Sequence, residues 1–296
     1  IIARGIENSI APERRDAVGK RIVAALDSNW SLKHTFGRSS AMQPRLALQY
    51  LIVYTLTFVS LFASLLFMRS VCLSLTGSPA AATLAPLAFA VAIPLLMSKN
   101  GYFYDFPEIL FMSLGAWLAL RDRWIALAVV TAIATLNKET YFLFALALMP
   151  FMIKGRPTSR DVLKIVAVVA AGVIVNLAVK AHYAASPGAP IELHLRDNLQ
   201  FYLNPLSYLR LAIDYGVVMP NAFFVVNIAL VVALVVRGWP MLSQPTRRHA
   251  IICAVINFPL FFVFCAPEEL RNLSLLYITL TVLIAFNLKR WIRATE

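Results

Sequence analysis

Long apolar segments are the feature that most constrains how this chain can fold. The sequence is 60% apolar and only 14% charged, whereas soluble domains average about 45–50% apolar and about 25% charged residues. A helix needs about 20 apolar residues to cross a bilayer. The sequence therefore predicts an all-α fold, a polytopic integral membrane helix bundle over residues 46–296. We expect nine apolar segments, at about 46–69, 80–97, 107–120, 124–136, 139–153, 162–180, 218–236, 249–266 and 273–288.

Three of these segments, 107–120, 124–136 and 139–153, are short. A helix over 124–136 is about 20 Å long, which is less than the ~30 Å hydrocarbon core of a bilayer. Such a helix must end within the membrane, against protein or a water-filled cavity. We therefore expect the polar residues at its end to lie below the membrane surface.

Residues 1–45 form the only long polar stretch. Pro12 is a suitable first residue of a helix, and Val18, Ile22 and Leu26 share one face of the helix that follows. This pattern favours a helix that lies along the membrane surface. We expect it to belong to an extracytoplasmic loop over 1–45.

Basic residues predict the orientation of the bundle, because Lys and Arg gather in cytoplasmic loops. They cluster in four regions, Arg121–Arg123, Lys154–Lys164, Arg237–Arg248 and Lys289–Arg293. If these regions are cytoplasmic, five others lie outside: 1–45, 98–106, 137–138, 181–217 and 267–272. An odd number of segments leaves the N-terminal stretch outside despite its own basic residues. We therefore expect a further membrane helix before Ile1.

The chain carries a net charge of +12. In a membrane protein this charge fits contact with the anionic lipids of the bilayer, and no soluble basic module is present that could bind nucleic acid. The three cysteines, Cys72, Cys253 and Cys265, lie in or beside apolar segments without metal-binding spacing. We expect them to be packing residues.

Polar side chains gather in the regions expected outside. The run Tyr104-Asp105-Phe106-Pro107-Glu108 places two carboxylates three residues apart at a helix start. They either cap the helix or serve a site, because a carboxylate at the start of a membrane segment is costly. The run Asn137-Lys138-Glu139-Thr140 joins the two shortest segments. Its charges either form a structural ion pair or line a polar cavity.

Two further groups lie closer to the C-terminus. The run Pro267-Glu268-Glu269-Leu270-Arg271-Asn272 is either a solvated turn or a phosphate site, because the guanidinium fork of Arg suits phosphate. In the loop 181–217, Glu192 and His194 are either metal ligands or solvated residues. The chain contains no nucleotide-binding loop, Rossmann glycine pattern, serine-hydrolase elbow or zinc motif. Any chemistry must therefore use a substrate that reaches an outer cavity.

These runs and the short segments between them resemble the multi-spanning C-type (GT-C) membrane glycosyltransferase superfamily. The resemblance rests on Tyr104 to Glu108, on Asn137 to Thr140, and on Glu269-Leu270-Arg271 before the last segment. It implies transfer of a hexose or pentose from a polyprenyl-phosphate carrier to a glycan or lipid acceptor, on the extracytoplasmic face of a bacterial inner membrane. It also implies a large first outer loop with surface helices, which residues 1–45 match.

One feature of the superfamily has no clear counterpart. Its usual catalytic Asp follows the first membrane helix, a position that here falls before Ile1 or on Glu7, Asp16 or Asp27. The resemblance therefore leaves the identity of the catalytic base open.

The chemistry of such a transfer suits the polar residues. A carboxylate deprotonates the acceptor hydroxyl, and cationic side chains or a divalent metal ion stabilise the leaving phosphate. The candidate catalytic residues are Asp105, Glu108 and Glu139, the candidate phosphate-binding residues are Lys138 and Arg271, and the candidate supporting residues are Tyr104, Asn137 and Glu269. We expect the charged members to converge on one outer cavity, because buried charges must be paired or hydrated.

Two other functions remain open. One is a transporter or flippase of lipid-linked or small solutes, since short interrupted helices with charged ends are also typical of transporters. The other is a non-catalytic membrane subunit, which would tolerate replacement of the outer carboxylates. The chain shows no convincing internal repeat and its polar groups concentrate on one side, which favours the enzyme.

Overall fold

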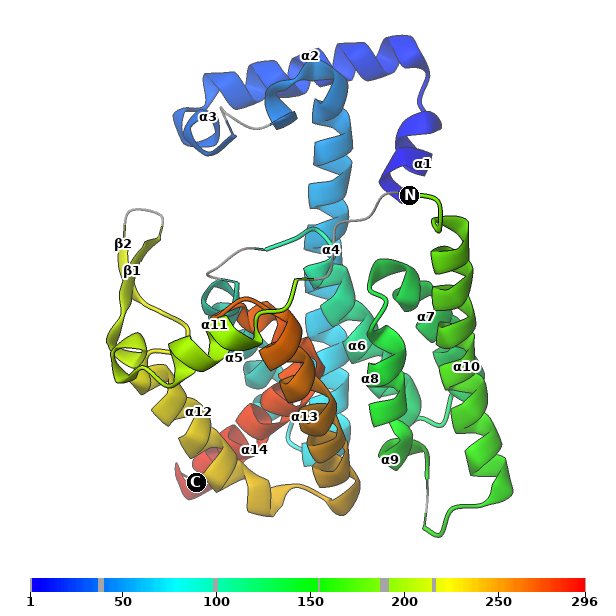
Figure 1. The fold of residues 1–296 in the computed structure, drawn as a ribbon, viewed down its shortest axis with the longest axis vertical. Coiled ribbons are helices and arrows are strands. Elements are labelled where there is room, and N and C mark those ends of the chain that lie inside the picture. Colours follow the sequence, from blue (N-terminus) through cyan, green and yellow to red (C-terminus); the bar gives the residue numbers. More distant parts are fainter. Residues whose placement is uncertain are drawn as a thin grey trace. The chain divides into compact units, whose positions relative to one another are not determined.

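The computed structural model describes residues 2–36, 40–97, 101–153, 155–186, 192–214 and 217–295. The chain forms two compact units, Ile1–Ser60 and Leu61–Glu296. The described chain is helical apart from one antiparallel hairpin, formed by β1 (Leu211–Asp214) and β2 (Val217–Pro220) (Figure 1). The prediction of a helical bundle is confirmed. Parts of the regions expected outside, at 98–100, 187–191 and 215–216, lie beyond the described residues.

The first unit consists of short helices and the beginning of a long one. Its elements are α1 (Ile2–Asn8), α2 (Pro12–Ser28), α3 (Trp30–Phe36), the 3-10 helix η1 (Ser40–Met42) and the first part of α4 (Pro44–Thr76). Helix α2 begins at Pro12, as the sequence predicts. It packs closely on the start of α4 at Gly19, where a Cβ atom would collide with the carbonyl oxygen of Pro44.

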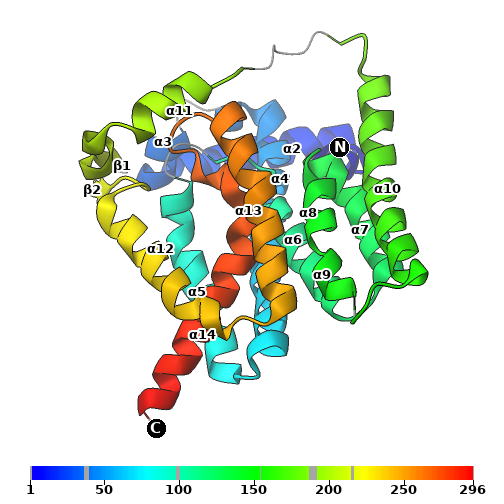
Figure 2. The same cartoon turned by 60° about the horizontal axis from the view of Figure 1, so that its bottom comes forward.

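The second unit holds the rest of the chain, including the remainder of α4. Its further helices are α5 (Pro79–Leu96), α6 (Asp105–Leu120), α7 (Trp124–Asn137), α8 (Tyr141–Ala147), α9 (Met149–Met152), α10 (Ser159–His182), α11 (Leu195–Tyr202), η2 (Pro205–Leu209), α12 (Val225–Gly238), η3 (Trp239–Met241), α13 (Gln244–Phe264), η4 (Leu270–Leu276) and α14 (Tyr277–Thr295). Figures 1 and 2 show α6 and α13 near the middle, α7, α8 and α10 to one side, and α5, α12 and α14 to the other.

Five helices of the described chain are long and apolar enough to cross a membrane. They span Pro44–Thr76, Pro79–Leu96, Ser159–His182, Gln244–Phe264 and Leu270–Ala294. Two shorter apolar helices span Trp124–Asn137 and Val225–Met241. The structure therefore supports a membrane protein, but it does not confirm nine membrane segments.

Two of the predicted segments differ from the helices of the structure. The segment expected at 139–153 divides into α8 and α9, and Pro150 lies in the first turn of α9, because a proline inside a helix removes a hydrogen bond and clashes with the preceding turn. The segment expected at 218–236 starts later, since Val217–Pro220 forms β2 and α12 begins only at Val225.

Close contact between α7 and α10 depends on a small residue. A Cβ atom at Gly172 of α10 would lie 2.8 Å from the Cβ atom of Phe142 and 3.0 Å from Cγ2 of Thr131. Small residues of this kind let membrane helices approach closely. The opposite side of α10 exposes Leu163, Ile174 and Leu177, which fits contact with lipid.

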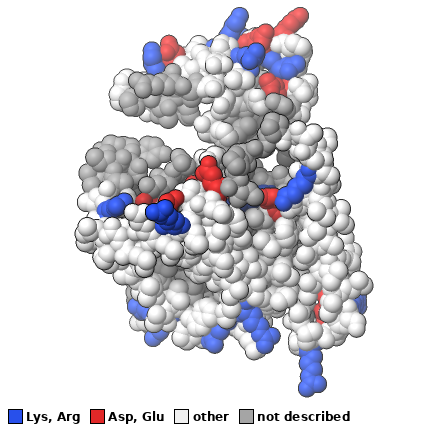
Figure 3. All heavy atoms as spheres, viewed as in Figure 1, with Lys and Arg blue, Asp and Glu red and all other residues white. Residues whose placement is uncertain are grey.

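Several Lys and Arg side chains lie at the lower end of the view in Figure 3, and others lie higher on both sides. Lys164 at the start of α10 binds Asp122 in the α6–α7 turn, with Nζ 2.8 Å from Oδ1. Lys289 of α14 donates a hydrogen bond to the carbonyl of Thr76, and Arg247 donates one to the carbonyl of Pro240 at 2.7 Å. The turns expected in the cytoplasm therefore share one end of this unit.

Candidate functional site

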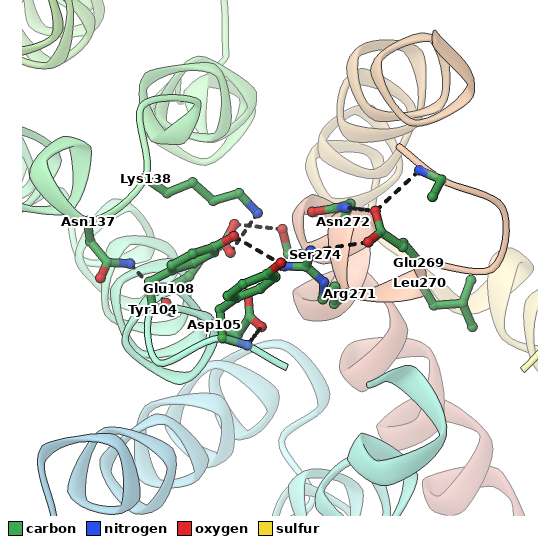
Figure 4. Close-up of polar contacts among 12 residues, drawn as sticks. Tyr104, Asp105, Glu108, Asn137, Lys138, Glu269, Leu270, Arg271, Asn272 and Ser274 are labelled. Atoms are coloured by element: carbon green, nitrogen blue, oxygen red, sulfur yellow. Dashed lines mark hydrogen bonds and ion pairs between the residues drawn. The ribbon is translucent and has the colours of Figure 1, made fainter. Parts of the chain in front are cut away.

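Polar side chains from three separate segments of the second unit meet in one group (Figure 4). The segments are the start of α6, the end of α7, and η4 with the residue before it. We call this group the polar network and define it as Tyr104, Asp105, Glu108, Lys138, Glu269, Arg271 and Ser274. The polar network includes the first turn of α6, and the basic turn at Arg121 directly follows the last turn of the same helix. The polar network and the basic turn therefore lie at opposite ends of α6.

Glu108 joins all three segments. Its carboxylate accepts a bond from Nζ of Lys138 at 2.8 Å and from Oγ of Ser274 at 2.6 Å. The side chain is only 2% exposed. With both carboxylate oxygens bonded, Glu108 is suited to hold the segments together.

Arg271 forms the second part of the polar network. Its Nη1 lies 3.6 Å from Oδ1 of Asp105, and its Nη2 lies 3.4 Å from Oε1 of Glu269. Arg271 is 6% exposed, and its Nε has no hydrogen-bond partner among the described residues. The guanidinium is therefore buried between two carboxylates with one donor still available.

Asp105 also has an atom without a hydrogen bond. Its Oδ2 accepts a hydrogen bond from the backbone N–H of Tyr102 at 2.7 Å, whereas its Oδ1 has no hydrogen-bond partner among the described residues. Burial raises the pKa of Asp105, and the Tyr102 bond and the charge of Arg271 act in the opposite direction. The Oδ1 atom thus lies beside a cation, without a hydrogen bond of its own.

Two tyrosines cover the guanidinium. The rings of Tyr102 and Tyr104 stack at 5.3 Å with an angle of 3° between their planes. Arg271 lies over the Tyr102 ring, 4.3 Å from its centre, and donates a hydrogen bond to Oη of Tyr104 at 3.2 Å. Both tyrosines are partly exposed. Asn137 fastens this turn by donating to the Tyr104 carbonyl at 3.0 Å.

Glu139 does not join the polar network. Its carboxylate pairs with Lys180 of α10 at 3.3 Å, and both side chains are 64% exposed. The Glu139 carbonyl accepts a hydrogen bond from Asn176 of the same helix at 3.4 Å. The structure therefore brings together seven of the eight candidates, including Asn137, and places Glu139 on the α10 side of the turn.

The length of α10 shows how deep the Lys138 turn lies. Lys164 of α10 contacts the turn at one end of α7, and Asn176 contacts the turn at the other end. These contacts lie about 18 Å apart along α10, and α10 continues for about 9 Å beyond Asn176, at 1.5 Å per residue. The turn that holds Lys138 thus stops short of the end of a helix that is long enough to span a membrane.

Glu268 is a buried carboxylate that is not among the candidate residues predicted from the sequence. It is 4% exposed, accepts a hydrogen bond from Nδ2 of Asn221 at 2.7 Å, and has a positive φ of 69°. Such a φ is uncommon for a residue other than glycine. The run of charges around it resembles a solvated turn, so the sequence gives no signal of its burial.

The structure does not favour a metal site at the positions considered. His194 lies 3.5 Å from Glu192 and 3.3 Å from Asp197. However, no three His, Cys, Asp or Glu residues in the described part of the chain are arranged to hold a metal ion. Asp105 and Glu108 are instead engaged with Arg271 and Lys138, so we assign no step to a divalent metal.

The acidic residues considered near the N-terminus belong to the first unit. Glu7 and Asp16 line a small hollow together with Arg15 and Arg45, and Asp27 pairs with Lys33 at 3.0 Å. Their positions give no support for choosing any of them as the catalytic base.

Comparison with known proteins gives no match. No protein-family model, no curated protein and no solved structure is similar to this chain. The resemblance to C-type glycosyltransferases therefore rests on short sequence motifs and on the order of the segments.

The polar network brings together groups of opposite charge. It holds the buried cation Arg271 next to a carboxylate oxygen of Asp105 that has no hydrogen bond. Buried ionised groups persist when they are paired, and an anionic ligand would compete with Asp105 and Glu269 for the guanidinium. The arrangement suits a substrate that carries a phosphate and a group that must lose a proton.

Proposed function

We propose that this chain is an integral membrane glycosyltransferase that uses a polyprenyl-phosphate-linked sugar at the polar network. The observation that carries the proposal is the convergence of Asp105, Glu108, Lys138 and Arg271, which are distant in sequence, on one buried group. The network lies at the end of the second unit opposite the basic turns at Arg121–Arg123 and Arg237–Arg248. Because basic loops tend to stay in the cytoplasm, this position supports a reaction on the extracytoplasmic face. A bacterial inner membrane is the location that the resemblance supports.

The proposed reaction balances as a single displacement. The acceptor hydroxyl oxygen forms a bond to the anomeric carbon of the sugar, and the bond from that carbon to the phosphate oxygen breaks. The polyprenyl phosphate leaves with the electron pair. Asp105 takes the proton of the hydroxyl, and Arg271 stabilises the phosphate charge. Lys138 adds positive charge to the site and holds Glu108.

Asp105 is the best of the three carboxylates for the role of base. Both oxygens of Glu108 are already bonded, and Glu139 lies outside the polar network beside Lys180. Only Asp105 combines burial, a neighbouring cation and an oxygen without a hydrogen bond. Glu108 is accordingly a positioning residue, and Glu139 fastens the turn to α10.

The distribution of buried charge favours an enzyme over a transporter. In the described second unit, the buried charged residues are Asp105, Glu108, Glu268 and Arg271 at the network end and Lys164 at the basic end. Transporters usually bind their substrates near the membrane midplane. A site confined to one end of the bundle fits chemistry on a substrate that stays on that side.

A lipid-binding experiment tests the role assigned to Arg271. Purified protein in nanodiscs is titrated with undecaprenyl phosphate, and undecaprenol serves as the control lipid without a phosphate. We expect Arg271→Met to weaken binding of the phosphate lipid at least about tenfold, because hydrogen bonds to charged groups contribute about 1.5–3 kcal/mol. Arg196→Met, on an exposed part of α11, is the matched control and should bind normally. Equal binding of both lipids would contradict the proposal.

We also expect the two ends of the second unit to face opposite sides of the membrane. In a Cys265→Ser background, single cysteines are introduced at the exposed positions Ser159 and Ser186. An impermeant thiol reagent should label position 186 in intact bacterial cells, and should label position 159 only after the cells are opened. Labelling at 159 but not at 186 in intact cells would reverse the proposed orientation.

A further inference from the structure

Helix α11 presents three different faces. At 3.6 residues per turn, successive side chains are about 100° apart, so Leu195, Leu199 and Leu203 form one stripe. Arg196, Asp197 and Gln200 form a second stripe, and His194, Asn198 and Phe201 form a third. We call the first of these the leucine stripe. The three stripes occupy separate sectors around the helix axis, so each can contact a different environment.

The third face is packed against the protein. Nδ2 of Asn198 donates hydrogen bonds to the carbonyls of Phe262 at 2.9 Å and Cys265 at 2.8 Å. The backbone N–H of His194 donates to the carbonyl of Val263 at 2.8 Å. The last carbonyls of a helix lack partners within it, so these bonds complete the end of α13 and fix α11 there.

The leucine stripe is strongly exposed among the residues that the structure describes. Leu203 is 77% exposed, and Leu195 and Leu199 are also exposed. The exposed apolar surface continues along the chain into η2, where Leu206 and Leu209 are exposed as well. A row of exposed leucines on an otherwise polar segment calls for an apolar partner.

Lipid is the partner that fits the position of the leucine stripe. Helix α13 is long and apolar enough to cross a membrane, and its last turns expose Phe258, Phe262 and Phe264. The carbonyls that hold α11 belong to those same turns. The leucine stripe therefore lies beside the end of the exposed apolar surface of α13. The stripe formed by Arg196, Asp197 and Gln200 faces a different direction and can contact water.

We propose that α11 and η2 form an interfacial segment, which inserts the leucine stripe into the bilayer leaflet at the end of α13. The partner is the lipid bilayer itself. One face of α11 binds α13, the leucine stripe lies among acyl chains near the headgroups, and the polar stripe faces water. Amphipathic helices of this kind lie in the plane of the interface with the apolar face at shallow depth.

Quenching of a site-specific fluorophore tests this proposal on the full chain in nanodiscs. In the Cys265→Ser background, bimane is attached at Leu199→Cys or Leu203→Cys, with Gln200→Cys as the matched control on the polar stripe of the same helix. Lipids carrying a spin label near the headgroup, or near the end of the acyl chain, act as quenchers from the membrane. Iodide acts as the quencher from water.

We expect the shallow spin label to quench the two leucine positions at least about twofold more strongly than position 200, because interfacial helices are buried about 5–10 Å deep. Iodide should show the opposite order. Equal accessibility of positions 203 and 200 to iodide would overturn the proposal, because the leucine stripe would then face water. Protection of position 203 from both lipid and iodide would also overturn it, since a protein surface would then cover the stripe.

Discussion

Replacement of Asp105 by Asn is expected to lower the rate of sugar transfer by about 10²–10⁴-fold, the usual contribution of a general base. Asn keeps the size of the side chain, and its Oδ1 atom can still accept the hydrogen bond from the backbone of Tyr102. The carboxylate oxygen that would receive the proton is lost. The measurement is transfer of a labelled sugar from a polyprenyl-phosphate donor in proteoliposomes that contain the purified protein.

Glu139→Gln is the matched control for Asp105→Asn. It makes the same chemical change at a carboxylate that lies outside the polar network, paired with Lys180 and 64% exposed. We expect transfer to stay within about twofold of the native rate, because exposed ion pairs contribute only about 0–1 kcal/mol. An equal loss in both variants would show that the network does not mark the site, and full activity of Asp105→Asn would remove Asp105 as the base.

Several helix boundaries follow from local chemistry and could be predicted from the sequence. Proline at the start of α2 and a carboxylate at the start of α6 both lie where the sequence predicts, since each favours the first turn of a helix. The basic turn at Arg121–Arg123 also separates α6 from α7 as expected. The β-hairpin at 211–220 could not be predicted, because its strands are short and follow an apolar pattern that continues into α12.

The charged members of the polar network could be predicted, but its member Ser274 and the exclusion of Glu139 could not. Charges that enter apolar segments must find partners, which points to Asp105, Glu108, Lys138 and Arg271. Glu139 follows Lys138 directly, but Lys138 has an extended backbone with φ −148° and ψ 119°. Neighbouring side chains on extended backbone point to opposite sides, so Lys138 reaches Glu108 while Glu139 reaches Lys180.

The loop 181–217 shows a different limit of sequence reasoning. Its polar residues Glu192, His194 and Asp197 suggest a solvated loop, and they hide the spacing of Leu195, Leu199 and Leu203. The three leucines recur every four residues, but the helix has only eight residues. So short a helix does not give a clear amphipathic pattern in the sequence. The hydrogen bonds of Asn198 to the end of α13 fix the orientation of α11.

Loss of Lys138 should destabilise the fold strongly. Lys138→Met leaves the carboxylate of Glu108, which is 2% exposed, without its cation, and breaking a buried pair in this way costs about 3–5 kcal/mol. The free energy of unfolding of Lys138→Met, compared with that of the native protein, measures this loss.

The double variant Glu108→Gln, Lys138→Met separates the pair from its surroundings. Removing both charges leaves no unpaired buried ion. We therefore expect the double variant to recover most of the free energy of unfolding that Lys138→Met loses. The same cycle on Glu139 and Lys180, both 64% exposed, should change the free energy of unfolding by no more than about 1 kcal/mol at any step. Unfolding of the purified protein by sodium dodecyl sulfate in mixed micelles measures all six variants. If the two cycles give equal effects, the Glu108–Lys138 pair is exposed in solution, and the polar network does not hold α6, α7 and η4 together.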